Sequence, residues 1–212
     1  IDHCCHDAVN LSSMTQCFEI ERTFSNEDVK YIERMTVGQA ENVIWVEERL
    51  TRLTASTFGD EFCLKKVSLI NHWGRKQGAA AQLKYKIVLQ YPDIKIRECR
   101  LFVGTNTPFL GAIEISEYTD DGKNMKGVLE NKCPASDKWR SLSPDECCQD
   151  SGFYSELNST TGHLKLNHNH KYYHQVQGQL ALTGLEWCDF VIMTLGGISV
   201  EQYILMQIIA KI

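Results

Sequence analysis

Apolar side chains recur at helical spacing through the first part of the chain. The run after Ser25 places acidic residues in a first turn, which is typical of a helix start. Apolar positions three and four residues apart predict two further helices, over about 41–53 and about 71–89. Residues 1–25 show no period of this kind, so we expect a loosely structured arm there.

The spacing shortens to alternation after residue 94, which predicts a meander of strands. The expected strands are residues 94–102, 110–118 and 127–133. Asp120-Asp121-Gly122-Lys123 is typical of a tight turn before the last of them. Residues 134–169 are polar and are expected to be rich in loops.

Helical spacing returns over residues 170–183, and an apolar run from Trp187 to Thr194 then predicts a buried strand. Ser199 has the chemistry of a helix cap, so a terminal helix is expected to begin there. The order is helices, a strand meander, and then helix, strand and helix. Such an order predicts a single domain of the α/β or α+β class over residues 26–212.

The composition narrows the class of protein. The chain has 212 residues, of which 43% are hydrophobic, as in soluble globular proteins. Its longest apolar run is far shorter than the ~20 residues of a membrane span, so no membrane partner is expected. The net charge of −5 argues against a chain coated in basic residues.

One segment is nevertheless strongly basic. Between residues 65 and 100, nine side chains are Lys or Arg and only two are acidic. Phosphate contacts come mainly from these two residue types, so this segment is the best candidate for a surface that faces DNA. A solvated helix or strand face is the alternative interpretation for any one of these residues.

The use of cysteine indicates reduced thiols. The nine cysteines are odd in number and include adjacent pairs, so we expect an intracellular protein of the nucleus or cytoplasm. His3-Cys4-Cys5-His6 lacks the ligand spacing of zinc sites and is interpreted as part of a flexible polar arm. Packing or DNA contact is favoured over a metal site for three clustered histidines, His168, His170 and His174.

Glu130, Asn131 and Lys132 carry the pattern with the clearest chemistry. Side chains alternate between the faces of a strand, so Glu130 and Lys132 are expected to point the same way. A carboxylate can hold Mg²⁺ through its oxygens, and a lysine beside it can position the attacking water or neutralise phosphate charge. The same spacing is also common as an ordinary ion pair on exposed strands, so the tripeptide alone leaves both interpretations open.

Several segments carry recognisable motifs in a fixed order. They are Trp45 with Arg49 and residues 52–59, Trp73-Gly74 with Tyr85, residues 106–112, residues 129–134 (Leu-Glu-Asn-Lys-Cys-Pro), residues 170–180 and residues 187–190. Through these segments, residues 41–200 of the chain resemble the lambda-exonuclease-like, YqaJ-type viral recombinase nucleases of the restriction-endonuclease-like superfamily.

This resemblance implies a restriction-endonuclease-like α/β fold, with a central mixed sheet flanked by helices. It also implies a deoxyribonuclease that depends on Mg²⁺ or Mn²⁺ and hydrolyses phosphodiesters at duplex DNA ends in recombination or repair. The partners that it implies are double-stranded DNA ends, a recombination protein and further copies of the chain in a homo-oligomer.

The resemblance further implies roles for individual residues. Glu130 would be a metal ligand, Lys132 the catalytic lysine, and Gln175 would line the active site from its helix. In-line attack on a phosphodiester needs cations beside the developing negative charge and an oriented water. The implied DNA contacts are Arg49, Arg52 and Ser56.

Two positions depart from the family's motifs. Gly78 stands where the family has a glutamate after Trp-Gly, and Ile115 stands where it has a metal-binding aspartate. Glu114 would replace the aspartate only after the loss of one residue from the preceding turn, and a one-residue slip moves a side chain to the other face of a strand. Two outcomes stay open: a nuclease that recruits Glu114 as its second metal ligand, or a catalytically impaired member that acts as a DNA- or partner-binding module.

Overall fold

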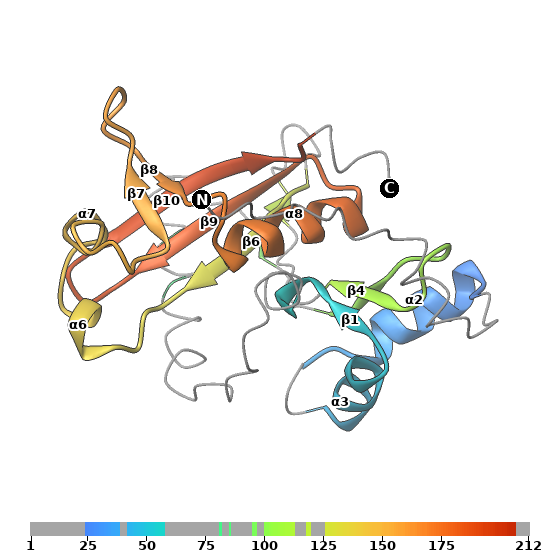
Figure 1. Ribbon diagram of the computed structural model, residues 1–212. Coiled ribbons are helices and arrows are strands. Elements are labelled where there is room, and N and C mark those ends of the chain that lie inside the picture. Colours follow the sequence, from blue (N-terminus) through green and yellow to red (C-terminus); the bar gives the residue numbers. More distant parts are fainter. Residues whose placement is uncertain are drawn as a thin grey trace, which may run out of the picture.

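The computed structural model describes residues 24–38, 42–57, 100–112 and 126–206, together with residues 81, 85, 95–96 and 118–119. Residues 1–23 of the predicted arm, most of the predicted helix over 71–89 and the predicted turn at 120–123 lie outside this part of the chain. The described elements form a mixed α/β structure (Figure 1). Among the described helices, none is long and apolar enough to cross a membrane.

Two helices come first in the described part. α2 (Asn26–Met35) begins where the acidic turn predicts. Ser25 Oγ accepts a hydrogen bond from Asp28 N at 3.2 Å, and Asp28 Oδ2 accepts one from Ser25 N at 2.9 Å. α3 (Val43–Leu50) is shorter than predicted, because the chain continues from it into the strand β1 (Leu53–Thr54).

The first small mixed sheet follows these helices. Its other strands are β3 (Phe102–Val103) and β4 (Leu110–Ala112), and the strand order is β1-β4-β3. β1 runs parallel to β4, and β3 runs antiparallel to it. The side chains of Ile32, Trp45, Leu101 and Val103 form one buried cluster, which attaches α2 and α3 to this sheet.

The second mixed sheet carries the candidate site. Its strands are β6 (Val128–Lys132), β9 (Trp187–Met193) and β10 (Ile198–Ile204), in the order β10-β9-β6. β6 and β9 are parallel, and the helix α8 (Lys171–Thr183) provides the crossover that parallel neighbours need. Figure 1 shows α8 lying across this sheet, and the helix also contacts β3 and β4.

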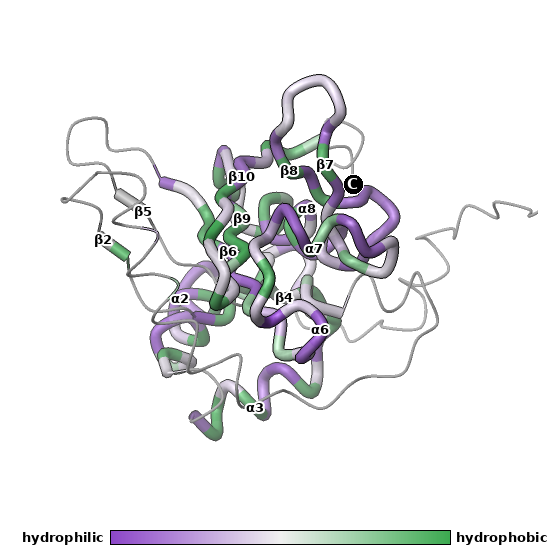
Figure 2. The backbone as a smooth tube through the Cα atoms, turned by 90° about the vertical axis from the view of Figure 1, so that its left-hand side faces the viewer, coloured by the Kyte–Doolittle hydropathy of each residue, from purple (hydrophilic) through white to green (hydrophobic). Residues whose placement is uncertain are grey.

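Among the described residues, the strands of the predicted mixed sheet fall into several small sheets. The described residues form two three-stranded mixed sheets with α8 in contact with both, and two further strand pairs. One of these pairs is β2 (Lys95–Ile96) with β5 (Tyr118–Thr119). The main core lies between α8 and the second sheet, where Val176 and Phe190 are fully buried. Figure 2 shows β9 as mostly hydrophobic, in agreement with its burial on both faces.

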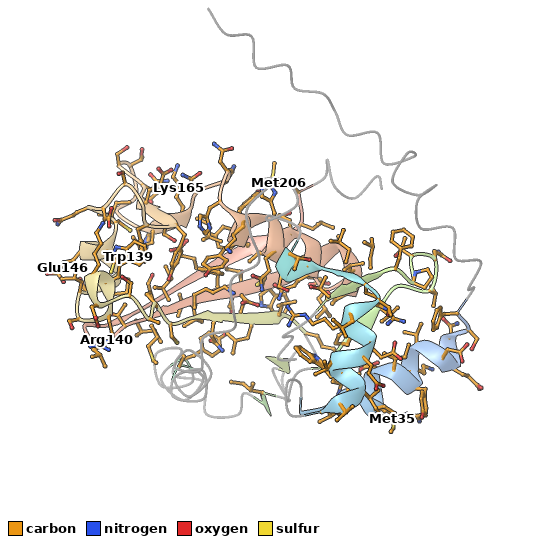
Figure 3. All side chains as sticks on the ribbon, turned by 60° about the horizontal axis from the view of Figure 1, so that its bottom comes forward. Met35, Trp139, Arg140, Glu146, Lys165 and Met206 are labelled. Atoms are coloured by element: carbon orange, nitrogen blue, oxygen red, sulfur yellow. The ribbon has the colours of Figure 1, made fainter. Side chains whose placement is uncertain are left out.

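Residues 134–169 contain more regular structure than their polarity predicts. The elements are α6 (Asp137–Arg140), α7 (Pro144–Cys147), β7 (Ser155–Leu157) and β8 (Leu164–Leu166). Ser136 and Ser143 cap the two short helices, and β7 pairs with β8 as a hairpin. Figure 3 marks α6 and α7 with Trp139 and Glu146, at the end of the molecule away from Met35 of α2.

Residues 198–204 form a strand, so the prediction of a helix that begins at Ser199 is wrong. Ser199 lies inside β10, where each residue from Ile198 to Ile204 pairs with a residue of β9. β-branched side chains at both ends of this segment favour an extended backbone, and pairing with a buried strand outweighs the preference of one capping residue. The preceding turn requires Gly196, since a Cβ there would lie 2.5 Å from the carbonyl carbon of Leu142.

Candidate active site

Glu130 and Lys132 form an ion pair on the face of β6 that α8 covers. Glu130 is fully buried, and its Oε1 lies 2.5 Å from Lys132 Nζ. The lysine side chain is 17% exposed, so its ammonium lies at the border between the core and solvent. The two side chains share a face because they are two residues apart on a strand, as the sequence pattern predicts.

Helix α8 supplies the partners of this ion pair. Tyr172, Gln175 and Gln179 are three and four residues apart, so they lie on one face of the helix. Lys132 Nζ donates a hydrogen bond to Gln175 Oε1 at 3.1 Å and lies 4.4 Å from the centroid of the Tyr172 ring. Gln179 Nε2 donates a hydrogen bond to Glu130 Oε2 at 2.7 Å. Each end of the ion pair is therefore held by one glutamine.

Local contacts set the position of α8 over the sheet. His170 caps the first turn with its side chain, and Gly184 ends the helix in the left-handed region at φ 66°. Gln177 points away from the ion pair. Its Nε2 donates to Ile204 O at 3.0 Å, and its Oε1 accepts from Met206 N at 2.8 Å. These contacts fasten α8 to the segment that follows β10.

The surroundings of Glu130 suit a bound cation. Its Oε1 lies in the ion pair with Lys132, and its Oε2 accepts the hydrogen bond from Gln179. Each carboxylate oxygen can take more than one partner, and carboxylate oxygens are the atoms that Mg²⁺ and Mn²⁺ prefer. Glu130 therefore fits as one ligand of a divalent cation.

The predicted second ligand, Glu114, lies outside the described residues, as do Gly78 and Ile115. Among the residues that the structure does describe, no group of three His, Cys, Asp or Glu side chains could hold a metal ion. Mg²⁺ is commonly held by one or two carboxylates together with waters and substrate phosphates. A single buried glutamate is compatible with a cation site of that kind.

A second polar cluster lies where α3 leads into β1. Arg49 Nη2 donates to Ser56 Oγ at 3.4 Å, and the guanidinium lies 5.0 Å from the centroid of the Trp45 ring. Thr54 Oγ1 lies 3.0 Å from Ser56 Oγ. Between these hydroxyl residues, Ala55 is fully buried in the same core cluster as side chains of β6 and α8. The cluster therefore adjoins the layer of the ion pair, and its groups are typical partners of a phosphate.

Arg52 is placed differently from Arg49. Its side chain is 5% exposed, its Nη1 forms an ion pair with Glu48, and its Nε donates to Pro108 O at 2.8 Å. These partners join α3 to the turn before β4. The Arg52 guanidinium is thus engaged inside the protein.

Asp189 is a second buried acid, but it lies on the opposite face of the sheet. In the parallel register of β6 and β9, Glu130 is paired with Phe190, which places the neighbouring Asp189 on the other face. Tyr85 OH donates to Asp189 Oδ2 at 2.5 Å, and Gln202 Nε2 donates to its Oδ1 at 3.0 Å. Burial raises the pKa of Asp189. Its position excludes Asp189 as a ligand beside Glu130.

The cysteines and histidines near the site have structural contacts. Burial raises the pKa of the Cys133 thiol to about 11, so this free thiol is protonated at neutral pH and is a poor nucleophile. The His168 ring stacks on Tyr173 with centroids 4.2 Å apart, and His170 caps α8. Packing accounts for these two histidines, and burial lowers the pKa of His174.

Most of the basic segment 65–100 lies outside the described residues. Its last member, Arg100, donates to Glu33 Oε1 of α2 at 2.9 Å. This arginine therefore has a partner within the protein, and the prediction of a DNA-facing surface stays a prediction for the rest of the segment.

Sequence reasoning missed three residues of the site and its surroundings. Two of them are Tyr172, three residues before Gln175, and Gln179, four residues after Gln175. This helical spacing is the signal that would have placed both on the same helix face as Gln175. Asp189 is the one charged residue within the apolar run from Trp187 to Thr194, which is a signal for a buried acid with dedicated partners.

A comparison with protein families gives one clear match. The profile of the YqaJ-like viral recombinase domain matches residues 35–186, which is most of the chain. No curated protein matches the chain.

Solved structures of LHK-Exo and of a SOX–DNA complex share the fold. The crystal structure of LHK-Exo in complex with dAMP is 19% identical over 79% of this chain and 84% of that chain, with a TM-score of 0.54. A second structure of LHK-Exo, an alkaline exonuclease from Laribacter hongkongensis, has the same identity and coverage and a TM-score of 0.52. A SOX–DNA complex is 12% identical over 79% of this chain and 59% of that chain, with a TM-score of 0.52. The fold agrees with the family match, and the chain belongs to the YqaJ-like viral recombinase domain family.

Proposed function

We propose that this protein is a metal-dependent deoxyribonuclease that hydrolyses phosphodiester bonds at duplex DNA ends, in recombination or repair. The observation that carries the proposal is the buried ion pair of Glu130 and Lys132, held at both ends by glutamines of α8. Membership of the YqaJ-like viral recombinase domain family supports it. The likeness to a DNA-bound SOX structure and to LHK-Exo with dAMP favours DNA as the substrate class.

The proposed chemistry divides among the described residues. Glu130 would hold Mg²⁺ or Mn²⁺, with Glu114 as the second ligand, and the bound ion would supply Lewis acidity and an activated water. Lys132 lies at the border with solvent, where its ammonium can neutralise phosphate charge or orient the water. Gln175 holds that ammonium at 3.1 Å and so limits the positions it can take.

Phosphate contact is assigned to the cluster at the end of α3. Arg49 stacks on Trp45 and reaches Ser56, so a guanidinium and a hydroxyl are already close together before DNA binds. Arg52 would contact DNA only after exchanging Glu48 or the carbonyl of Pro108 for a phosphate. The homo-oligomer and the recombination partner that the family resemblance implies belong to the same proposal.

The test is cleavage of linear duplex DNA with 5′-phosphates by the purified protein. We expect digestion with Mg²⁺ or Mn²⁺, none with EDTA, and none by Lys132→Ala, which should still bind DNA ends. Equal digestion by the wild type and by Lys132→Ala would contradict the proposal, as would a wild type that cuts nothing.

A second candidate function rests on the loss of acidic residues at two of the family's positions. The family's glutamate and aspartate positions carry Gly78 and Ile115, and the described residues bring one carboxylate to the site, that of Glu130. These features favour a catalytically impaired member that binds DNA ends or a partner protein. This function predicts a mobility shift of duplex ends that EDTA does not change, and no cleavage above a blank. Robust Mg²⁺-dependent cleavage would exclude it.

A further inference from the structure

Helix α8 carries three buried glutamines, and each contacts a different group. Gln175, Gln177 and Gln179 are at most 3% exposed. Gln175 contacts the ammonium of the ion pair, and Gln177 contacts the backbone after β10. Gln179 is the glutamine that contacts the carboxylate, through a 2.7 Å hydrogen bond from its Nε2 to Glu130 Oε2.

Gln179 orients the Glu130 carboxylate without bringing a positive charge to it, whereas Lys132 does bring one. The terminal torsion of a glutamate is soft, so a carboxylate with one partner can turn about its last bond. The hydrogen bond from Gln179 on Oε2 and the ion pair with Lys132 on Oε1 together fix its plane. Lys132 brings a positive charge that competes with a cation for the same oxygen. Gln179 is neutral, so it orients the carboxylate and leaves its negative charge in place.

We propose that Gln179 is a positioning residue that holds Glu130 in the orientation in which it binds the divalent cation. The proposal rests on the proposed function, because it assigns the cation to Glu130. It goes beyond that function, because Gln179 would act on the affinity for the cation and Gln175 would act on the lysine. Partners in the second layer of metal sites commonly change metal affinity by about 10- to 100-fold when they are removed.

The experiment compares Gln179→Met with Gln177→Met. The two glutamines are two residues apart on one helix and equally buried, and both replacements remove an amide while keeping an unbranched side chain. Binding of Mn²⁺ alone, without DNA, is followed by the electron paramagnetic resonance signal of the free ion. We expect Gln179→Met to bind Mn²⁺ about 10- to 100-fold more weakly than the wild type, and Gln177→Met to bind it with unchanged affinity.

A second readout separates positioning from general damage. In cleavage assays at increasing Mn²⁺, Gln179→Met should need a higher concentration for half-maximal rate and should approach the wild-type rate at saturation. Gln179→Asn has a shorter side chain that keeps the amide but loses the reach to Glu130. If Gln179→Met does not fold, Gln179→Asn takes its place and should show the same loss of Mn²⁺ affinity.

The outcomes distinguish this proposal from the proposed function. Wild-type Mn²⁺ affinity in the Gln179 variants, or an equal loss in Gln177→Met, would overturn the role of Gln179. A wild type that binds Mn²⁺ but cuts no DNA would overturn the nuclease function, and the Mn²⁺ affinities would still decide the role of Gln179. A wild type that binds no Mn²⁺ would overturn the role of Gln179 directly.

Discussion

Lys132 Nζ lies 2.5 Å from Glu130 Oε1, so the lysine is the counter-ion of a carboxylate that has no exposure to solvent. In the proposed function, Lys132 has to share this carboxylate with a bound cation. Gln175 and the ring of Tyr172 are the partners that can hold the ammonium when it does so. The pair therefore links the stability of the fold to the chemistry of the site.

Loss of the counter-ion should destabilise the protein in the absence of metal. Lys132→Met leaves the buried Glu130 carboxylate uncompensated, and we expect the free energy of unfolding to fall by about 3–5 kcal/mol. Urea denaturation with EDTA present measures this change. The double variant Glu130→Gln/Lys132→Met should recover most of the loss, because no buried charge is left. A loss in the double variant as large as in Lys132→Met would contradict the counter-ion role.

An exposed ion pair provides the control for this measurement. Lys165 Nζ lies 3.0 Å from Glu156 Oε1 on the β7–β8 hairpin, and both side chains are about half exposed. Exposed pairs contribute little to stability, so Lys165→Met should leave the denaturation midpoint nearly unchanged.

Removal of the Gln175 amide should change the rate of cleavage and not the affinity for metal. Gln175 Oε1 accepts from Lys132 Nζ, while Glu130 keeps its own bond from Gln179. We expect Gln175→Met to cut DNA about 10- to 100-fold more slowly at saturating Mg²⁺, with the same Mg²⁺ concentration at half-maximal rate. Single-turnover cleavage across a Mg²⁺ series measures both quantities. A shifted Mg²⁺ midpoint with an unchanged maximal rate would reverse the roles given to the two glutamines.

The cluster at the end of α3 should contribute to DNA affinity. Arg49→Ala removes the guanidinium that stacks on Trp45 and contacts Ser56. We expect weaker binding to 5′-phosphorylated duplex ends and a salt dependence with a slope smaller by about one, since one phosphate contact is lost. Fluorescence anisotropy over a salt series measures this. Arg34→Ala, at an exposed position on α2, is the matched control, and an equal effect of both variants would argue against a specific contact.

Glu201 should make the stability of the fold depend on pH. Burial raises the pKa of this carboxyl to about 7 from 4.5, although Tyr203 OH donates to its Oε2 at 2.5 Å. The folded protein therefore holds a proton that the unfolded chain releases above pH 4.5. The contribution of Glu201 to the free energy of unfolding is complete below that pH and is lost as the pH rises through about 7.

The variant Glu201→Gln removes this titration. We expect it to match the wild type near pH 4.5 and to be more stable above pH 7, by about 2–3 kcal/mol. Thermal unfolding across a pH series measures the difference. Glu156→Gln, at an exposed position, should show no such trend. Parallel stability curves for Glu201→Gln and the wild type would show that Glu201 does not titrate with a raised pKa.

The strand and helix periods of the sequence were sufficient to predict which faces carry Glu130, Lys132 and Gln175. Alternation on a strand places Glu130 and Lys132 on one face wherever that strand lies, and helical spacing places Gln175 on one stripe of its helix. The helix start after Ser25 is local in the same sense, because the capping box joins residues three apart. These features depend on backbone geometry within a few residues, so the sequence by itself determined them.

Contacts between segments far apart in the sequence decided which side chains meet at the site and which segments become strands. Gln175 and Gln179 meet Lys132 and Glu130 across 43 and 49 residues of chain, so the division between the two amides depends on how α8 lies over β6. The register of β6 against β9 places Asp189 on the opposite face. Ser199 lies in a strand because β9 offers a full ladder of backbone hydrogen bonds, which no local preference for a helix cap can match. Local propensities are worth fractions of a kcal/mol for each residue, whereas a buried sheet and its packing act on the whole segment together.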